Sequence, residues 1–360
     1  MEKDAVLARG PRFLQGEAVK RVSFVIPVLN SAATLGECLD AILAQDFPRA
    51  DFEIVIADAG SSDATLEIAK SKGVDRIVPN PLKTGEAGKA AGIEAAEGEF
   101  IALVDSDNIL PGPGWLKAMM APFEDAGVFA SEPIEYVARE TDPALTRYFA
   151  ALGMNDPICL FVGNYDRMCA VTGKWTGLDV PYERFETPSG AYRRLDLAGR
   201  VMPTIGANGF VFRRKVLDGV SWKPYFFDID VAAEAVAKGA GAIAKVETGI
   251  VHLYCAKISA FAMKQRRRIR DFLFFAKAKS RTYPWQAQKK SGIVLFCLSC
   301  ATLLPLLVQA CLLKSRARVP WNVALLHLPV CYVTLWVYAL GVLSRLFRKP
   351  QMADRSKWQK

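Results

Sequence analysis

Two long apolar runs near the carboxyl end limit most strongly what this chain of 360 residues can fold into. Residues 293–313 and residues 323–343 each form a run of 21 residues without a formal charge. An α-helix of about 20 apolar residues crosses the hydrocarbon core of a bilayer, so each run is long enough to span it. Pro305 and Pro329 do not exclude such spans, since proline is tolerated in membrane helices. We therefore predict a hairpin of two transmembrane helices over residues 291–345; the alternative is a pair of helices buried in a soluble protein.

Charge divides the chain near the same place. Residues 1–256 carry 26 basic and 35 acidic side chains, whereas residues 257–360 carry 20 basic and 2 acidic ones. A nucleic-acid-binding protein would carry its basic residues more evenly, so we expect no nucleic-acid partner. Basic residues are denser on the two outer flanks of the hairpin than in the turn at 314–322. The positive-inside rule then predicts an inner (cytoplasmic) membrane protein with both hairpin ends and residues 22–256 facing the cytoplasm.

These features divide the chain into five parts. They are an N-terminal extension (1–21), a folded domain (22–256), a basic amphipathic segment expected at the membrane interface (257–290), the hairpin (291–345) and a basic cytoplasmic tail (346–360).

Within the folded domain, short apolar runs typical of strands alternate with helical patterns. Strands are expected at 22–28, 52–57, 74–78 and 100–104, with helices at 34–44, 63–71 and 86–96 between them. This alternation predicts an α/β fold with a mostly parallel sheet and helices on both faces. Asn30, Asp58 and Asp105–Asp107 each follow a strand directly. Because such sheets bind ligands at the carboxyl ends of their strands, we expect these residues to converge on one rim.

The triplet Asp105-Ser106-Asp107 places two carboxylates where a buried strand enters a loop. Such carboxylates bind Mg²⁺ or Mn²⁺ and leave coordination positions open for diphosphate oxygens. The nearest match to a phosphate-binding loop, residues 85–89, has the wrong spacing for that motif. A nucleotide on this rim would therefore be held by side chains and a metal.

Four segments resemble the family-2 glycosyltransferases of the GT-A fold: 27–30, 58–63, 98–101 and 105–107. The resemblance is strongest over residues 22–118 and continues more loosely through 204–239 and 252–270. It implies a GT-A, Rossmann-like mixed sheet, with a nucleotide-sugar half at 22–118 and an acceptor half at 119–256.

The resemblance also implies roles in binding a nucleotide-diphosphate sugar. Asp58 would contact the base, Asp105 the sugar or ribose, and Asp107 the metal that bridges the diphosphate. Lys89 stands where the family often has an arginine close to the donor. The remaining donor-site residues of this half would be Pro27, Val28, Asn30 and Ser106.

Residues 226–231 resemble the E-D-x-D segment of the family, with Phe227 in place of the glutamate. By position, Asp228 would be the general base that takes the proton of the attacking acceptor hydroxyl. Two alternatives stay open: Asp230 could substitute for it, and Asp228 could merely cap a helix over 231–238.

His252 follows an apolar run of strand type. In GT-A enzymes a histidine at this point often completes metal coordination, so the resemblance implies a metal site of Asp105, Asp107 and His252. The alternative is a structural histidine.

Residues 265–269 resemble the Q-x-x-R-W signature of membrane-bound family members, with Ile269 in place of tryptophan. By this resemblance Gln265 and Arg268 would bind the leaving diphosphate, because a guanidinium donates paired hydrogen bonds to phosphate oxygens. The alternative is an interfacial helix that meets headgroups with its arginines and inserts seven apolar residues into lipid. These are Phe261, Met263, Ile269, Phe272, Leu273, Phe274 and Phe275.

The whole pattern predicts a membrane-bound, metal-dependent, inverting glycosyltransferase that moves a sugar from a nucleotide-diphosphate sugar to a lipid or lipid-linked glycan. Two other readings stay open: a polyprenyl-phosphate glycosyltransferase, and a non-catalytic membrane scaffold that retains a GT-A domain. Oligomer formation is also left open. The hairpin is expected to act as a tether, since all candidate site residues precede residue 290.

Overall fold

The computed structural model describes residues 21–278, 281–283, 289 and 291–344. The predicted basic tail, and the N-terminal extension apart from Arg21, therefore lie outside the described residues. A ten-stranded mixed sheet forms the centre of the described part. Its strands are β1 Val22–Val28, β2 Phe52–Asp58, β3 Arg76–Pro79, β4 Phe100–Leu103, β5 Asn108–Ile109, β6 Val128–Val137, β7 Glu183–Thr187, β8 Gly190–Asp196, β9 Phe210–Arg213 and β10 Ala242–His252.

The strands lie in the order β3-β2-β1-β4-β9-β6-β10-β8-β7, and β5 pairs with β10 outside this path. Strands β1 to β4 are parallel to one another, while β9 runs antiparallel between β4 and β6. The predicted strands agree with β1 to β4 to within two residues at each end. The strand order reverses at β1, which is where ligands bind in open α/β sheets.

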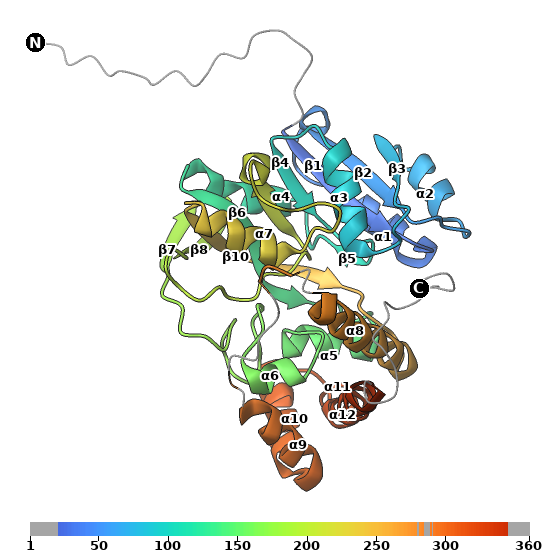
Figure 1. Ribbon diagram of the computed structural model, residues 1–360, viewed down its shortest axis with the longest axis vertical. Helices are drawn as coiled ribbons and strands as arrows, with labels where there is room; N and C mark the ends of the chain where they lie inside the picture. Colours follow the sequence, from blue (N-terminus) through green and yellow to red (C-terminus); the bar gives the residue numbers. More distant parts are fainter. Residues whose placement is uncertain (1–20, 279–280, 284–288, 290, 345–360) are drawn as a thin grey trace, which may run out of the picture.

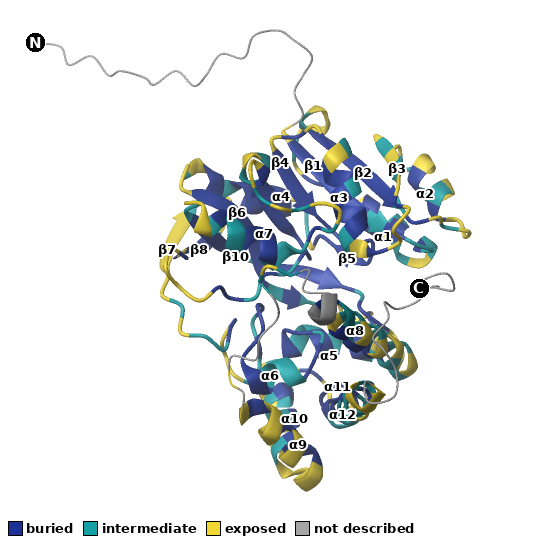
Figure 2. Ribbon diagram, in the orientation of Figure 1, coloured by how far each residue is buried: buried dark blue, intermediate teal, exposed yellow. Residues whose placement is uncertain are grey.

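Helices cover both faces of the sheet (Figure 1). On β1, Phe24 and Ile26 join the core under α1 (Ala32–Leu43), α2 (Thr65–Ser71) and α4 (Trp115–Met120). Val25 joins the core under α3 (Gly85–Ala95) and α7 (Asp228–Ala237). The central strands β1 and β2 are buried apart from Pro27 and Asp58, as Figure 2 shows, because both faces are packed. The α/β prediction is confirmed.

A third core joins the domain to the carboxyl-terminal helices. Tyr148 and Phe149 of α5 pack with Phe261 of α8 and with Val323 and Val330. In Figure 1 these helices lie below the sheet. The remaining helices are α5 Ala144–Leu152, α6 Ile158–Val162, α8 Ile258–Ala278, α9 Ser291–Thr302, α10 Leu304–Arg316, α11 Trp321–Ala324 and α12 His327–Leu343.

The first apolar run is not one straight helix. Its two parts, α9 and α10, meet at an angle of 94°. Leu303 between them has a φ of 65°, and Pro305 stands in the first turn of α10. Proline lacks an N–H and its ring clashes with the carbonyl one turn earlier, so the run breaks here.

The second run lies within the helical stretch Trp321–Leu343, made of α11 and α12, which is long and apolar enough to cross a membrane. Within the described residues it is the one helix that meets this test, and the bent pair α9–α10 would have to count as one span to give two. The predicted hairpin of two transmembrane helices is thus not confirmed.

Helix α8 differs from the predicted interfacial helix. Four of the seven residues expected in lipid are buried by protein: Phe261, Ile269, Leu273 and Phe275. That part of the prediction is wrong, because α12 and the domain cover this face of α8. Met263 and Phe272 are exposed and could still meet a bilayer.

Candidate active site

The carboxyl ends of β1 and β2 are tied together by side chains. Val28 lies opposite Asp58 in the parallel register. Beyond it, Asn30 takes a positive φ of 49°, its N–H donates to Ser61 Oγ at 2.9 Å, and its Oδ1 accepts from the Ser62 N–H at 2.8 Å. These hydrogen bonds hold the loops after β1 and β2 together at the rim of the sheet.

A pocket of about 380 Å³ opens at the ends of β2 and β3, within the size range of small-molecule sites. The Asp58 carboxylate accepts hydrogen bonds from the N–H groups of Gly60 and Ser61 at 3.0 and 3.1 Å, so it also orders the loop beside the pocket. The lining residues are Asp58, Ala59, Gly60, Ile77, Val78, Pro79, Asn80, Pro81 and Lys83.

Three of the predicted donor residues support the rim by packing. Val28 is buried, and Pro27 approaches Gly88 of α3 so closely that a Cβ there would lie 2.7 Å from it. Ser106 is fully buried and its Oγ donates to Ser31 Oγ at 2.9 Å.

The short strand β5 brings Asp107 to His252. In the antiparallel pair β5–β10, His252 lies opposite Asn108, and the Leu253 N–H donates to the Asp107 carbonyl at 2.8 Å. As a result, His252 Nε2 lies 3.6 Å from Asp107 Oδ1. The Lys264 ammonium lies 3.8 Å from the other carboxylate oxygen.

This pair fits a divalent cation of the Mg²⁺ type. Within the described residues, no group of three or more potential ligands gathers in one place. Mg²⁺ is commonly held by one or two carboxylates, with substrate phosphates and water as its other ligands. Asp107 supplies one such carboxylate and His252 lies beside it, while Asp105 acts electrostatically on a second pair of charges, Lys89 and Asp228.

In that second pair, the Lys89 ammonium lies 3.3 Å from both Asp228 carboxylate oxygens. Asp228 is the first residue of α7, and its side chain is 15% exposed. Burial raises the pKa of Asp228 to about 6, although Lys89 acts in the opposite direction. Burial alone would lower the pKa of Lys89, but Asp228, Asp105 and Glu86 raise it overall, so the lysine stays charged.

Asp230 has a different environment. Its carboxylate accepts two hydrogen bonds from the Arg281 guanidinium, at 2.6 and 2.9 Å, and one from the Thr282 N–H at 2.9 Å. Arg281 also lies over the Phe227 ring, 4.0 Å from its centroid. Asp230 therefore fixes the segment that follows α8.

Gln265 and Arg268 lie in another cluster. Gln265 is fully buried, and its Nε2 donates to the Asn155 carbonyl at 3.4 Å. Arg268 donates to that carbonyl and to Asp156, both at 3.2 Å. Among the described residues, Gln265 and Arg268 form hydrogen bonds within this cluster and not with Lys89 or Asp228.

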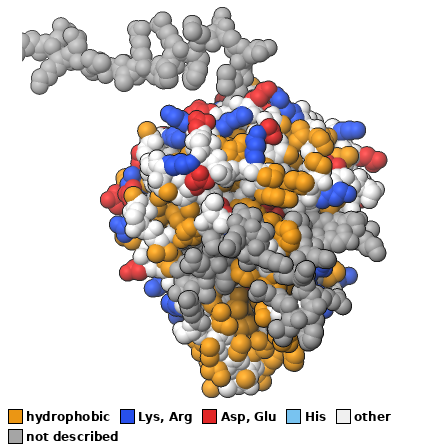
Figure 3. All heavy atoms as spheres, in the orientation of Figure 1, with side chains coloured by type: hydrophobic (Ala, Val, Ile, Leu, Met, Phe, Trp, Pro, Cys, Tyr) orange, Lys and Arg blue, Asp and Glu red, His pale blue; other side chains and the backbone are white. Residues whose placement is uncertain are grey.

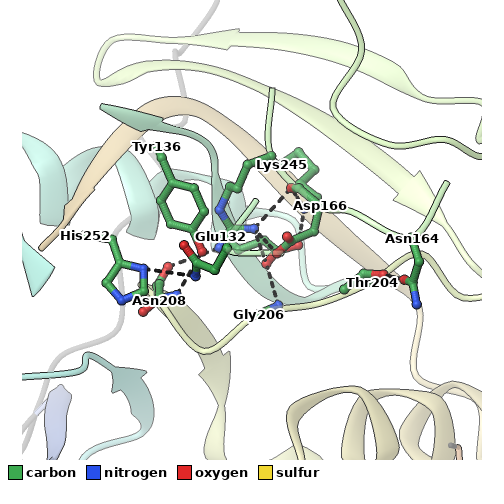
Figure 4. Close-up of polar contacts among 11 residues, drawn as sticks. Glu132, Tyr136, Asn164, Asp166, Thr204, Gly206, Asn208, Lys245 and His252 are labelled. Carbon is green, nitrogen blue, oxygen red and sulfur yellow. Dashed lines mark hydrogen bonds and ion pairs between the residues drawn. The ribbon is translucent and has the colours of Figure 1, made fainter. Parts of the chain in front are cut away.

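A buried network of ion pairs connects to His252 through Tyr136 (Figure 4). Arg167 pairs with Glu132 at 3.0 Å and with Asp166, and Lys245 pairs with Glu132. Arg167 also donates to the Asn208 carbonyl at 3.1 Å. The Asn208 side chain donates in turn to the hydroxyl of Tyr136, whose ring centroid lies 5.6 Å from that of His252.

No sequence motif marks this network. Removing one partner of a buried ion pair typically costs about 3–5 kcal/mol, because the other charge stays buried and uncompensated. The one signal in the sequence is a charged residue inside an apolar strand, as at Glu132 and Lys245.

Together, the mixed sheet and the acidic rim define an α/β domain of the GT-A class. The pattern that defines Glycosyl transferase family 2 matches residues 23–219, more than half of the chain. The protein belongs to this family, which confirms the predicted glycosyltransferase class.

Two curated relatives match shorter segments. Glycosyltransferase AglE of Haloferax volcanii is 28% identical over 145 residues, which are 38% of this chain and 47% of AglE. A poly(ribitol-phosphate) beta-glucosyltransferase of Bacillus spizizenii is 34% identical over 103 residues, which are 27% of this chain and 16% of the relative. The matched segment thus spans less than half the length of either protein.

Among solved structures, the mannosyltransferase PcManGT from Pyrobaculum calidifontis, in complex with GDP-Man and Mn²⁺, shares the fold. The TM-score is 0.50 at 19% identity, with 91% of this chain and 87% of the other covered.

Proposed function

We propose that this protein is a membrane-bound, inverting glycosyltransferase that moves a sugar from a nucleotide-diphosphate sugar to a lipid or lipid-linked glycan. The observation that carries the proposal is that three groups lie along the same carboxyl edge of the sheet. These are the pocket at Asp58, the Asp107–His252 pair, and the Asp228–Lys89 pair.

Each group has a distinct role in the proposed reaction. The pocket at Asp58 would take the nucleobase, and Asp107 and His252 would hold Mg²⁺ or Mn²⁺. The bound metal would neutralise the charge of the leaving diphosphate. Asp228 would accept the proton of an acceptor hydroxyl as that oxygen attacks the anomeric carbon. A single displacement of this kind inverts the anomeric centre and needs no covalent nucleophile.

A membrane location is supported by the apolar lower end of the molecule (Figure 3). Fourteen of the exposed large hydrophobic residues lie between Ile293 and Leu343. A patch of this extent on a folded protein is typical of an interaction surface. A lipid acceptor would then reach the enzyme from the membrane surface, next to this apolar end of the molecule. The orientation remains the one proposed from charge, with the catalytic domain in the cytoplasm.

Asp228 favours a hydroxyl acceptor over a polyprenyl phosphate. A phosphate acceptor is already anionic and needs no strong base, whereas a buried carboxylate with a pKa raised to about 6 is suited to accept a proton. The intact set of charges argues against a non-catalytic scaffold.

The test is a panel of nucleotide sugars offered to the full-length protein in detergent with Mn²⁺ and membrane lipid extract. We expect hydrolysis of one donor class without acceptor, and a lipid product heavier by one glycosyl unit in mass spectrometry. Failure of every donor to bind or react, in a protein shown to be folded, would overturn the proposal.

The pH dependence of sugar transfer should follow the protonation of Asp228. With a pKa of about 6, Asp228 loses its basic form as the pH falls, so the rate should decline below about pH 6 and level off above it. Replacement Lys89→Met removes the charge that lowers this pKa, so the midpoint should move to higher pH. The measurement is kcat/KM against pH for both proteins; an unmoved midpoint in the variant would contradict the assignment.

A further inference from the structure

Helix α12, part of the candidate membrane helix, packs directly on α8. Val337 of α12 forms a small apolar cluster with Ile269 and Leu273 of α8. The backbones approach closely at Gly341, where a Cβ would lie 2.9 Å from Ile269 side-chain atoms. Helix α8 also carries Gln265 and Lys264, whose ammonium lies near Asp107. The candidate membrane helix therefore packs against a helix that contributes a residue to the candidate active site.

Polar groups are buried in the same interface. The Tyr338 hydroxyl shares its one hydrogen between the Asp156 carboxylate and Gln265 Oε1, the second contact at 3.1 Å. Arg268 donates to the same two acceptors, each at 3.2 Å. Tyrosine is common at membrane–water interfaces, where its ring meets lipid and its hydroxyl meets polar groups. Tyr338 therefore links α12 to both members of the predicted Q-x-x-R signature.

The hydrogen bonds continue to the candidate metal site. Gln265 and Arg268 both donate to the Asn155 carbonyl, and the Asn155 side-chain amide lies 3.2 Å from His252 Nδ1. A metal-binding histidine is oriented by the partner of its other ring nitrogen, and such partners typically change metal affinity or activity 10- to 100-fold. Asn155 is that partner here, with Nε2 on the Asp107 side. Metal binding through Nε2 requires the hydrogen on Nδ1, so the amide oxygen of Asn155 and not its nitrogen must face Nδ1 when the metal is bound.

We propose that Tyr338 is a positioning residue that joins the candidate membrane helix to the metal site. It holds Gln265 and Asp156, which hold Asn155, which orients His252 beside Asp107. This inference rests on the proposed metal-dependent function. It also replaces the expectation that the carboxyl-terminal helices act as a tether: insertion of α12 assembles part of the donor site.

Loss of the tyrosine hydroxyl weakens this chain of contacts without breaking it. Gln265 is fully buried, and without Tyr338 its Oε1 keeps one of its two described donors, Arg268 at 3.2 Å, so its side chain is held less firmly. A less firmly held Gln265 allows the Asn155 carbonyl that it contacts to shift. The effect on His252 should be smaller than removal of Asn155 itself, so we expect about a 3- to 10-fold change in metal affinity.

The experiment compares Tyr338→Phe with Tyr332→Phe in the full-length protein, reconstituted in lipid nanodiscs. Tyr332 lies on the same helix, and its hydroxyl donates to the Cys300 carbonyl at 2.5 Å, away from this chain of contacts. Free Mn²⁺ is measured by electron paramagnetic resonance during titration, with and without nucleoside diphosphate. Tyr338→Phe should bind Mn²⁺ 3- to 10-fold more weakly and raise the donor KM more than it lowers kcat, whereas Tyr332→Phe should match the original protein.

Equal Mn²⁺ affinity in both variants would overturn the inference. Asp156→Asn, which weakens the acceptor shared by Tyr338 and Arg268, provides a second test if Tyr338→Phe does not fold, and it should weaken Mn²⁺ binding in the same direction. Absence of Mn²⁺ and nucleotide binding in the unsubstituted protein would instead count against the proposed function, so the two failures are distinguishable.

Discussion

Replacement Asp228→Asn should lower kcat by roughly 10²- to 10⁴-fold, the usual contribution of a general base. The amide has nearly the same shape but accepts no proton at neutral pH. Donor binding should survive, because the pocket at Asp58 and the Asp107–His252 pair are untouched. Steady-state transfer and nucleotide titration on the same preparation measure the two effects separately.

Asp230→Asn is the matched control. It lies two residues further along α7, and its carboxylate is engaged by Arg281 and Thr282. We expect a lower melting temperature and a change in kcat of less than about tenfold. If Asp230→Asn instead caused the larger loss of kcat, the base would have to be reassigned to Asp230. A defect of Asp228→Asn confined to nucleotide affinity would move Asp228 to the donor site.

Replacement Asp107→Asn should abolish metal-dependent transfer, with a loss of about 10³-fold or more. Stabilisation of a leaving diphosphate by a metal is worth several kcal/mol, and each 1.36 kcal/mol is a factor of ten in rate. Because the backbone of Asp107, directly before β5, is held by the hydrogen bond from the Leu253 N–H, the fold should persist.

The matching control is Asp46→Asn, an exposed carboxylate paired with Lys117. It should leave both the rate and its dependence on Mn²⁺ unchanged. Activity is measured against Mn²⁺ concentration and in excess chelator. Full activity of Asp107→Asn, or of the unsubstituted protein in chelator, would exclude the metal role.

The nucleotide half of the fold could be predicted because its signals are local. Each of β1 to β4 is a short apolar run, and each connecting helix shows its own periodicity. Since parallel strands end at one edge, the convergence of Asn30, Asp58 and Asp105 followed from their positions alone. The contact of Asp228 with Lys89 joins residues 139 positions apart, and only the family resemblance pointed to both.

The remaining features depend on pairings that leave little trace in the sequence. Strand β5 has two residues, yet it places His252 beside Asp107. The ionic network joins Glu132, Arg167 and Lys245 from separate segments. Composition identified the apolar runs at the carboxyl end, but the packing of α8 against α12 is a tertiary contact, and it buries Ile269 and Leu273, two of the α8 residues expected in lipid.

In the proposed membrane location, the bend between α9 and α10 affects how the protein responds to bilayer thickness. At 1.5 Å per residue, α9 with 12 residues and α10 with 13 are each about 18–20 Å long, whereas the hydrocarbon core is about 30 Å thick. Neither arm alone reaches across it. A bent pair that enters and leaves the bilayer on the same side does not need a length equal to the thickness of the hydrocarbon core. The acyl-chain length of the host lipid should therefore matter little to these arms, and any dependence on membrane thickness would come from Trp321–Leu343.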